Sequence, residues 1–232
     1  MSLPLSTDIE YTCRSNVNLY SSTQAAGLAS QVAAGRKIKI IDTNVENQVV
    51  RVRSVEDDYP GWLLVRDLRY LEPSIYFYEP LVIDRAKIEQ RLSAIMAFAE
   101  AAMAVPNQYL WGGTVAPDYD CSGLMQAAFM SQGVWLPRDS YQQEAFVQHI
   151  SIDELIPGDL IFFGTPQKTD HVAMHLGDRQ YIHSSGVEMG RNGIGLDLLL
   201  ADNPDKIGLG YWRKLRCCGR VMSSYQSLGC GR

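Results

Sequence analysis

The first third of the chain alternates apolar and polar residues over short runs. Three of these runs, rich in valine, isoleucine and leucine, read GRKIKIID, NQVVRVRSVEDD and GWLLVRDLRYL. Residues of types that favour turns lie between or within them, namely Gly35, Asn44, Asn47, Pro60 and Gly61. Short alternating strands separated by turns predict a small all-β barrel. Because no cluster of catalytic residue types occurs here, we expect this part to bind or gate a substrate.

The pattern changes after residue 70. The stretch LEPSIYFYEPL contains Pro73 and Pro80, and it predicts a linker because proline removes a backbone donor and resists helix. The next stretch, DRAKIEQRLSAIMAFAEAAMA, has apolar residues at helical spacing, with Asp84 as its N-cap and Pro106 beyond its end. We therefore place a boundary near residues 78–86, which gives a first domain over 1–78 and a second over 79–232.

The second domain begins with helices and continues with strands. A helix is predicted over CSGLMQAAFMSQG, with Gly133 as its stop signal, and a shorter helix over RDSYQQEAFVQHI. Four strand-like runs follow, reading GDLIFFG, HVAMHLGD, RQYIHSS and IGLDLLL. Helices followed by an antiparallel meander indicate an α+β fold, here preceded by the small barrel.

Composition excludes several functional classes. The chain has 232 residues, 46% of them hydrophobic, and a formal net charge of −5 without a basic block, which excludes a nucleic-acid partner. No run approaches the roughly 20 apolar residues of a membrane span. The opening MSLPLSTDIE has neither the basic nor the apolar region of a signal peptide. We therefore expect no membrane partner and a cytoplasmic location.

The chain has five cysteines: Cys13, Cys121, Cys217, Cys218 and Cys230. An odd number fits a reducing compartment better than a disulfide framework. The tail CCGRVMSSYQSLGC lacks paired metal-type spacings, and no histidine follows Cys217, so we expect no metal there. The sequence leaves open both the role of the three cysteines in this tail and the oligomeric state.

Cys121 lies in the stretch YDCSGLM, where a loop becomes a helix. A thiolate, and not a thiol, is the nucleophile, and the N–H groups of a helix N-terminus favour its formation. The same N–H groups can stabilise the oxyanion of a carbonyl under attack. The alternative is that Cys121 is a small buried residue without chemistry.

The chain has four histidines, and three of them fall in DHVAMHLGDRQYIHSSG. A hairpin turning at GDRQ brings His171 and His183 side by side on neighbouring strands. His171 then acts as the base for Cys121, and His183 orients its ring, as an Asp or Asn does in other triads. His175 lies on the same strand face as His171 and could replace either histidine. His149 is expected at the surface, at a helix end.

These residues carry a resemblance. Residues 86–216 resemble the NlpC-type cell-wall peptidases, a papain-like family of bacterial cysteine hydrolases. The matching stretches, in the family's order and spacing, are YLWGG, YDCSGLMQAAF, LPRDSYQQ, IPGDLIFFG, DHVAMHLGD and YIHSSG. Residues 8–72, including YPGWLLVRDLRYLEP, resemble a bacterial SH3-like domain. The resemblance implies a papain-like catalytic domain behind an SH3-like barrel.

The resemblance implies roles for single residues. Cys121 matches the nucleophile, His171 the general base and later general acid, and His183 the third polar position. Tyr109 matches a tyrosine near the reacting centre. Such enzymes need no cofactor and cut the γ-D-glutamyl bond to a diamino acid in peptidoglycan stem peptides, which are the implied partner.

The chain is similar to a subgroup in which an SH3-like domain helps to close the cleft. Members of that subgroup take peptides with a free N-terminal L-alanine, as in murein recycling. Asp120, Ser122 and Ser140 match the positions that bind the amino end. Tyr59, in the tight turn DDYPGW, is our candidate for a contact from the barrel.

Alternatives remain open for several residues. Asp120 also fits a helix N-cap, Ser140 a turn hydroxyl, and Tyr59 a side chain that packs on its own barrel. Asp58 and Asp67 are secondary candidates. Two other functions remain: a papain-like amidase or acyltransferase, and a non-catalytic cell-wall-binding protein. The sequence leaves open which diamino acid is preferred, and whether free muropeptides or the intact wall are cut.

Overall fold

A computed structural model describes residues 5–227 of the chain. These residues divide into two compact units. Residues 5–81, 111–115 and 225–227 form the first, which we call the barrel unit. Residues 82–110 and 116–224 form the second, which we call the helix–sheet unit.

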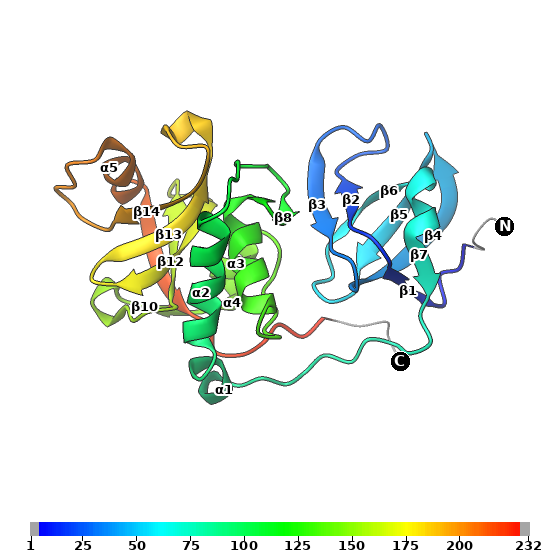
Figure 1. The fold of residues 1–232 in the computed structure, drawn as a ribbon, viewed down its shortest axis with the longest axis horizontal. Coiled ribbons are helices and arrows are strands. Elements are labelled where there is room, and N and C mark those ends of the chain that lie inside the picture. The colour runs from blue at the N-terminus through cyan, green and yellow to red at the C-terminus, as the bar shows by residue number, and fades with distance from the viewer. Residues whose placement is uncertain (1–4, 228–232) are drawn as a thin grey trace. The chain divides into compact units, whose positions relative to one another are not determined.

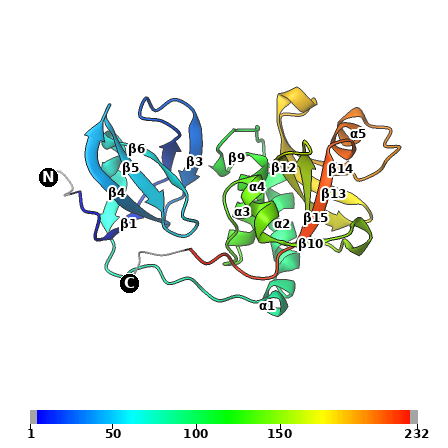
Figure 2. The same cartoon turned by 180° about the vertical axis from the view of Figure 1, so that it is seen from behind.

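The barrel unit consists of short antiparallel strands (Figure 2). They are β1 (Glu10–Cys13), β2 (Val17–Tyr20), β3 (Leu28–Val32), β4 (Lys37–Glu46), β5 (Val49–Ser54), β6 (Pro60–Leu64) and β7 (Leu71–Pro73). Among the described residues they form one sheet in the order β3-β2-β6-β5-β4-β1-β7. Alternate residues such as Ile38, Ile40 and Val52 are buried in its core, which is the outcome of the alternating pattern in the sequence.

One predicted strand is only half a strand. The run GWLLVRDLRYL ends as a strand at Leu64, and Val65–Tyr70 is a 3-10 helix, so the prediction was wrong for its second half. No residue of this segment is fully buried, although Leu68 and Tyr70 pack against the barrel core from the 3-10 helix.

A cluster of charged side chains is buried inside the barrel unit. Nη2 of Arg36 lies 3.0 Å from Oδ2 of Asp57 and 2.6 Å from Oγ of Ser54. Nε of Arg36 lies 3.4 Å from Oε2 of Glu56. Because each charged group in this cluster has a partner, the cluster is an internal structural contact of the barrel.

The helix–sheet unit has helices on both sides of one sheet (Figure 1). The helices are α1 (Arg85–Glu89), α2 (Leu92–Met103), α3 (Cys121–Met130), α4 (Ser140–Phe146) and α5 (Lys206–Trp212). The main strands are β10 (Gln148–Ile150), β11 (Leu160–Gly164), β12 (Thr169–Gly177), β13 (Gln180–Ser185), β14 (Gly193–Leu198) and β15 (Leu215–Arg220). Within the described residues they form an antiparallel sheet in the order β10-β15-β11-β12-β13-β14. Shorter elements are the strand pair β8 (Thr114–Val115) and β9 (Asp118–Tyr119), and the 3-10 turns Ile152–Glu154 and Val187–Met189.

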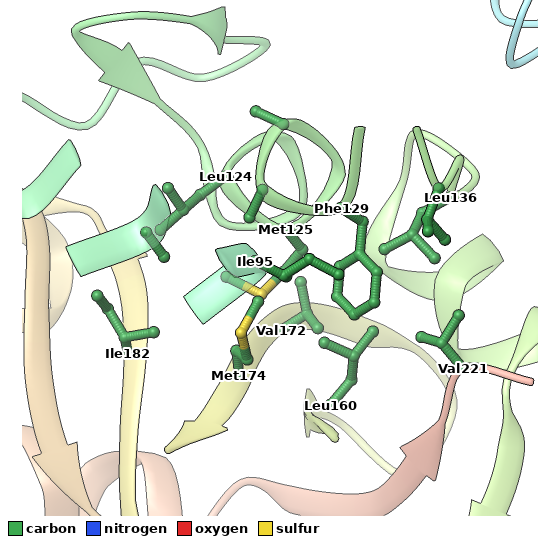
Figure 3. Packing of buried hydrophobic residues seen from close by; sticks show 14 of the residues in the cluster. Ile95, Leu124, Met125, Phe129, Leu136, Leu160, Val172, Met174, Ile182 and Val221 are labelled. Carbon is green, nitrogen blue, oxygen red and sulfur yellow. The ribbon is translucent and has the colours of Figure 1, made fainter. Parts of the chain in front are cut away.

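The main core lies between α2, α3 and the sheet (Figure 3). Ile95 of α2 and Phe129 of α3 are fully buried, and they share this core with Leu160, Val172 and Ile182 of the sheet. Burying a side chain of this size stabilises the fold by roughly 1.5–3 kcal/mol. This core fixes α3, and therefore its first residue, against β12. A second cluster on the opposite face includes Tyr181 and, from α5, Tyr211.

The predicted helices agree with the structure in place but not in length. Asp84 caps α1, since its carboxylate accepts a hydrogen bond from the N–H of Lys87 at 3.0 Å. The single helix predicted over 84–104 is divided into α1 and α2, because the N–H of Arg91 bonds to the carbonyl of Ile88 in a tighter turn. The helix predicted to reach residue 150 ends at Phe146, and the following residues pair with β15 instead.

The hairpin predicted at GDRQ is present. Its tip residues Asp178 and Arg179 have φ values of 47° and 61°, the conformation of a type I′ turn that joins antiparallel strands tightly. Strand β15 was not predicted, and it joins the sheet between β10 and β11. In the described part of the chain, no helix is long and apolar enough to span a membrane.

Candidate active site

Cys121 is the first residue of α3. Asp120 caps the helix, and its Oδ1 accepts a hydrogen bond from the N–H of Gly123 at 2.7 Å. The backbone N–H groups of Ser122 and Val172 face the sulfur of Cys121. Val172 follows His171 on β12, so the thiol lies beside the strand that carries this histidine.

The thiol of Cys121 is only 5% exposed. Burial raises its pKa to about 12, with a further contribution from the carboxylate of Asp120. The N–H groups of Val172 and Ser122 and the charge of Arg138 act in the opposite direction but do not outweigh burial. The helix N-terminus favours the thiolate, as expected, but does not produce it by itself. Attack by this sulfur would require a base to take its proton.

A chain of hydrogen bonds leads away from His171. Its Nε2 lies 2.7 Å from Nδ1 of His183, and Nε2 of His183 lies 2.7 Å from Oδ2 of Asp197. Nη2 of Arg191 lies 2.9 Å from both oxygens of Asp197. The hairpin thus brings the two predicted histidines into direct contact, and β14 contributes the carboxylate.

Asp197 and Arg191 are residues that the sequence reasoning missed. A signal was available, because Asp197 is the one acidic residue within the otherwise apolar run IGLDLLL. An acidic residue at a buried position of a strand generally needs a partner. Arg191 carried no such signal, since it lies in a loop before β14.

Burial favours the uncharged form of both histidines. Burial, with smaller electrostatic contributions from His183 and Lys214, lowers the pKa of His171 well below its usual value. Burial also lowers the pKa of His183, against the opposing effect of Asp197. A neutral imidazole at His171 can accept a proton from Cys121.

Aromatic rings enclose the two histidines. The ring of Tyr211 lies 4.5 Å from that of His171 and 4.7 Å from that of His183, centroid to centroid. Its hydroxyl lies 2.6 Å from Oγ of Ser185. The ring of Tyr181 lies 5.1 Å from that of His183. This enclosure restricts both imidazoles to one orientation.

Asp120 and Ser122 lie together with a buried arginine. Nη2 of Arg138 lies 2.7 Å from Oδ2 of Asp120, and its Nη1 lies 2.9 Å from Oγ of Ser122. Oγ of Ser122 lies 3.3 Å from Oδ1 of Asp120. Ser140 is buried at the start of α4. A substrate ammonium at Asp120 would therefore share the carboxylate with Arg138, and this binding role stays a prediction.

The two predicted tyrosines lie in different surroundings. Tyr109 is half-buried, and burial together with the nearby Cys121 and Asp120 raises the pKa of its hydroxyl, so it lies near the thiol. Tyr59 belongs to the barrel unit, where its N–H lies 3.3 Å from Oδ1 of Asp57. Asp58 pairs with Arg53 at 3.6 Å, and Asp67 lies in the 3-10 helix. A substrate contact from these barrel residues stays a prediction.

The remaining histidines and cysteines lie outside this arrangement. His175 is buried, and its Nδ1 has no hydrogen-bond partner within residues 5–227. His149 is exposed, as expected, but in β10 and not at a helix end.

The described cysteines of the C-terminal part also lie apart from the two histidine rings. The thiol of Cys217 donates to Oε1 of Glu144 at 3.0 Å, and Cys218 is buried. Cys230 lies outside the described residues. Within the described residues, no group of His, Cys, Asp and Glu could hold a metal.

Two family models match the chain. Residues 106–200 match the model of the NlpC/P60 family. Residues 19–68 match the model of the bacterial dipeptidyl-peptidase SH3 domain. The first match contains Cys121, His171, His183 and Asp197, and the second lies within the barrel unit.

Curated relatives match over part of their length. A gamma-D-glutamyl-L-lysine dipeptidyl-peptidase of Bacillus cereus is 40% identical over 83 residues, which are 34% of this chain and 25% of that protein. A probable endopeptidase p60 of Listeria innocua is 33% identical over 115 residues, which are 50% of this chain and 24% of that protein. The matches therefore span about a quarter of each of these relatives.

A solved structure matches both units. The crystal structure of an NlpC/P60 family protein from Bacillus cereus has a TM-score of 0.50 and 21% identity, over 93% of this chain and 64% of that one. At this identity the likeness shows the fold alone. The predicted α+β, papain-like fold with a preceding SH3-like unit is confirmed.

Proposed function

From the premise that the chain carries an NlpC/P60 domain preceded by a bacterial dipeptidyl-peptidase SH3 domain, we propose that it is a cysteine peptidase. It hydrolyses the γ-D-glutamyl bond to an L-diamino acid in peptidoglycan stem peptides. The preferred substrates carry a free N-terminal L-alanine and arise when murein is recycled.

One observation carries this proposal. The thiol of Cys121 lies beside the strand of His171, whose ring is connected to His183 and Asp197 by hydrogen bonds of 2.7 Å. The buried thiol is protonated at neutral pH, and a neutral imidazole is the base that such a nucleophile requires. The arrangement therefore fits acyl transfer through a thioester.

In the first half of the reaction, the sulfur of Cys121 attacks the γ-carbonyl carbon of the D-glutamyl residue. The thiol proton moves to Nδ1 of His171, and N–H groups at the start of α3 stabilise the oxyanion. The tetrahedral intermediate then breaks its C–N bond. The amine of the diamino acid leaves with the proton from His171, and a thioester remains on Cys121.

In the second half, water attacks the thioester carbon and gives its proton to His171. The C–S bond breaks, the D-glutamyl γ-carboxyl group leaves, and the proton returns to the sulfur. Each turnover consumes one water and restores both side chains. No electron transfer occurs, so no redox group is required.

The expected substrate follows from the relatives and from Asp120. The Bacillus cereus relative is named as a dipeptidyl-peptidase, an activity that releases two residues from a peptide's amino end. A carboxylate that binds the substrate ammonium would make this chain select the same end. A charge-assisted hydrogen bond of this kind contributes roughly 1.5–3 kcal/mol, which is about a tenfold to hundredfold preference for a free amino end.

The test is mass spectrometry of the products from L-Ala-γ-D-Glu-L-Lys, from the matching diaminopimelate peptide, and from intact peptidoglycan. We expect the dipeptide L-Ala-D-Glu and the free diamino acid from the short peptides, and much less product from the wall. The same products from Cys121→Ala at the wild-type rate would refute the proposal. The cytoplasmic location stays a prediction, which cell fractionation would test.

A further inference from the structure

The hydrogen-bond chain behind His171 ends in a charged pair. Oδ2 of Asp197 lies 2.7 Å from Nε2 of His183, and Nη2 of Arg191 lies 2.9 Å from both carboxylate oxygens. We propose that Asp197, held by Arg191, is a positioning residue that fixes His183 and His171 as Nε2–H tautomers. This inference deepens the proposed function. The kinetic test depends on the proposed function, whereas the test of the tautomers does not.

The direction of the chain follows from which groups can donate. A carboxylate accepts only, so the proton between Asp197 and His183 belongs to Nε2 of His183. A neutral imidazole carries one proton, which leaves Nδ1 of His183 as an acceptor. The bond of 2.7 Å to His171 is then donated by Nε2–H of His171. Nδ1 of His171 keeps its lone pair, and this is the ring nitrogen that can accept the proton of Cys121.

Without the carboxylate, nothing in the chain selects this direction. Each neutral imidazole could carry its proton on either nitrogen, and the two rings could reverse together. Nδ1 of His171 would then carry a proton and could not accept another from the thiol. Asp197 therefore acts on Cys121 through two rings, without touching the substrate.

Burial makes the carboxylate hard to replace. His183 is fully buried, and Asp197 and His171 are 8% and 6% exposed. Water therefore cannot readily supply an alternative acceptor to His183. Ionisable or charged groups face the two rings from the elements packed on them: Tyr181 of β13, Asp197 of β14, Arg191 of the preceding loop, Tyr211 of α5, and Lys214 beyond it. Cys121 of α3 lies beside β12, which carries His171. Of these groups, Asp197 is the one that accepts a hydrogen bond from a histidine ring in the described structure.

The decisive variant is Asp197→Asn, which keeps the shape and removes the charge. Nη2 of Arg191 lies 2.9 Å from both oxygens, so the amide of this variant places its NH₂ against that donor in either orientation, and neither orientation is fixed. Where the NH₂ faces His183, Nε2 of His183 must accept, and the proton moves to Nδ1. The same reversal passes to His171. The variant is therefore expected to populate the Nδ1–H tautomer on both rings, which the carboxylate of the wild type excludes.

The matched control is Asp159→Asn. Asp159 is fully buried in the same unit, and its Oδ2 lies 2.7 Å from Nη2 of Arg220, so it loses a comparable ion pair. It has no hydrogen bond to either histidine ring among the described contacts. A similar loss of Tm in both variants, with a tautomer change only in Asp197→Asn, separates positioning from structural support.

The first measurement needs no substrate. Long-range ¹H–¹⁵N NMR of the histidine rings reports which nitrogen carries the proton. We expect Nε2–H on both rings in the wild type at neutral pH and a measurable Nδ1–H population on both in Asp197→Asn. An Nδ1–H tautomer at His171 or His183 in the wild type overturns the proposal. This holds even if the variant does not fold.

The second measurement is kinetic. Asp197→Asn should lower kcat by roughly 5- to 100-fold, according to the share of molecules in which Nδ1 of His171 carries the proton, and change KM by less than about threefold. Alkylation of Cys121 by iodoacetamide, followed by peptide mass spectrometry, should show a changed pH profile only in this variant. Wild-type kcat together with unchanged tautomers in Asp197→Asn refutes the proposal. If the tautomers and alkylation follow expectation but no stem peptide is cut, the proposed function fails and the positioning role stands.

Discussion

Cys13 of the barrel unit and Cys121 of the helix–sheet unit are both buried thiols. Burial raises the pKa of each to about 12. The charges near Cys13 are those of Glu56, which adds to this rise, and of Arg36, which opposes it. Neither thiol is therefore ionised at neutral pH, and acidity alone does not distinguish them.

The difference lies in what stands beside each sulfur. Cys13 ends strand β1, whereas Cys121 begins a helix beside the strand of His171. The four histidines of the chain all lie between residues 149 and 183, within the helix–sheet unit. A histidine-bearing strand and nearby N–H donors therefore distinguish Cys121, the proposed nucleophile, from Cys13, while a lowered thiol pKa does not.

The largest effect should come from exchanging each cysteine in turn. Cys121→Ala removes the nucleophile and should reduce hydrolysis of L-Ala-γ-D-Glu-L-Lys by at least about 10⁴-fold. Cys13→Ala should keep kcat/KM within about twofold of wild type, since it loses only packing. Product formation followed by mass spectrometry measures both. A folded Cys13→Ala protein without activity would contradict the comparison.

The next effect concerns the base. His171→Gln removes the proton acceptor and should lower kcat by roughly 10²–10⁴-fold. His175→Gln, on the same strand but outside the hydrogen-bond chain, should lower kcat by less than about threefold. Steady-state kinetics of both variants test this. Equal losses of kcat in the two variants would mean that activity depends on the packing of the whole strand and not on proton transfer to His171.

A smaller effect should come from the substrate's amino end. N-acetylation of the stem peptide should lower kcat/KM by roughly tenfold to a hundredfold, because it removes the ammonium from Asp120. Asp120→Asn should reduce the difference between capped and free peptides. Tyr59→Phe tests the barrel in the same assay and should change KM by less than about tenfold. If capped and free peptides react equally in the wild type, the ammonium pocket does not exist.

The smallest effect concerns the pH dependence of Cys121 alkylation by iodoacetamide. The pKa of about 12 keeps the thiol protonated, so the rate should rise steadily through pH 7–9 without an acidic plateau. In unfolded protein the thiol has a pKa near 8.5, so unfolding should speed alkylation at pH 7. Peptide mass spectrometry separates Cys121 from Cys13. A plateau below pH 6 would show a thiolate–imidazolium pair instead.

Features that depend on neighbours in the chain were predictable. The start of α3 follows from Asp120 before an apolar helical run, and the hairpin follows from alternating strands around GDRQ. These two patterns place Cys121 at the start of a helix, and His171 and His183 on neighbouring strands. The helix predicted through residue 150 was wrong, because pairing of β10 with β15 outweighs local propensity.

The sequence by itself therefore determined the fold class, the helix that begins with the cysteine, and the pair of histidines. Tertiary structure alone decided the rest: Asp197 and Arg191 at the end of the histidine chain, Arg138 on Asp120, and the raised pKa of Cys121. The physical reason is that turns, caps and strand alternation are short-range. Burial and partner choice, in contrast, depend on residues that only the folded sheet brings together.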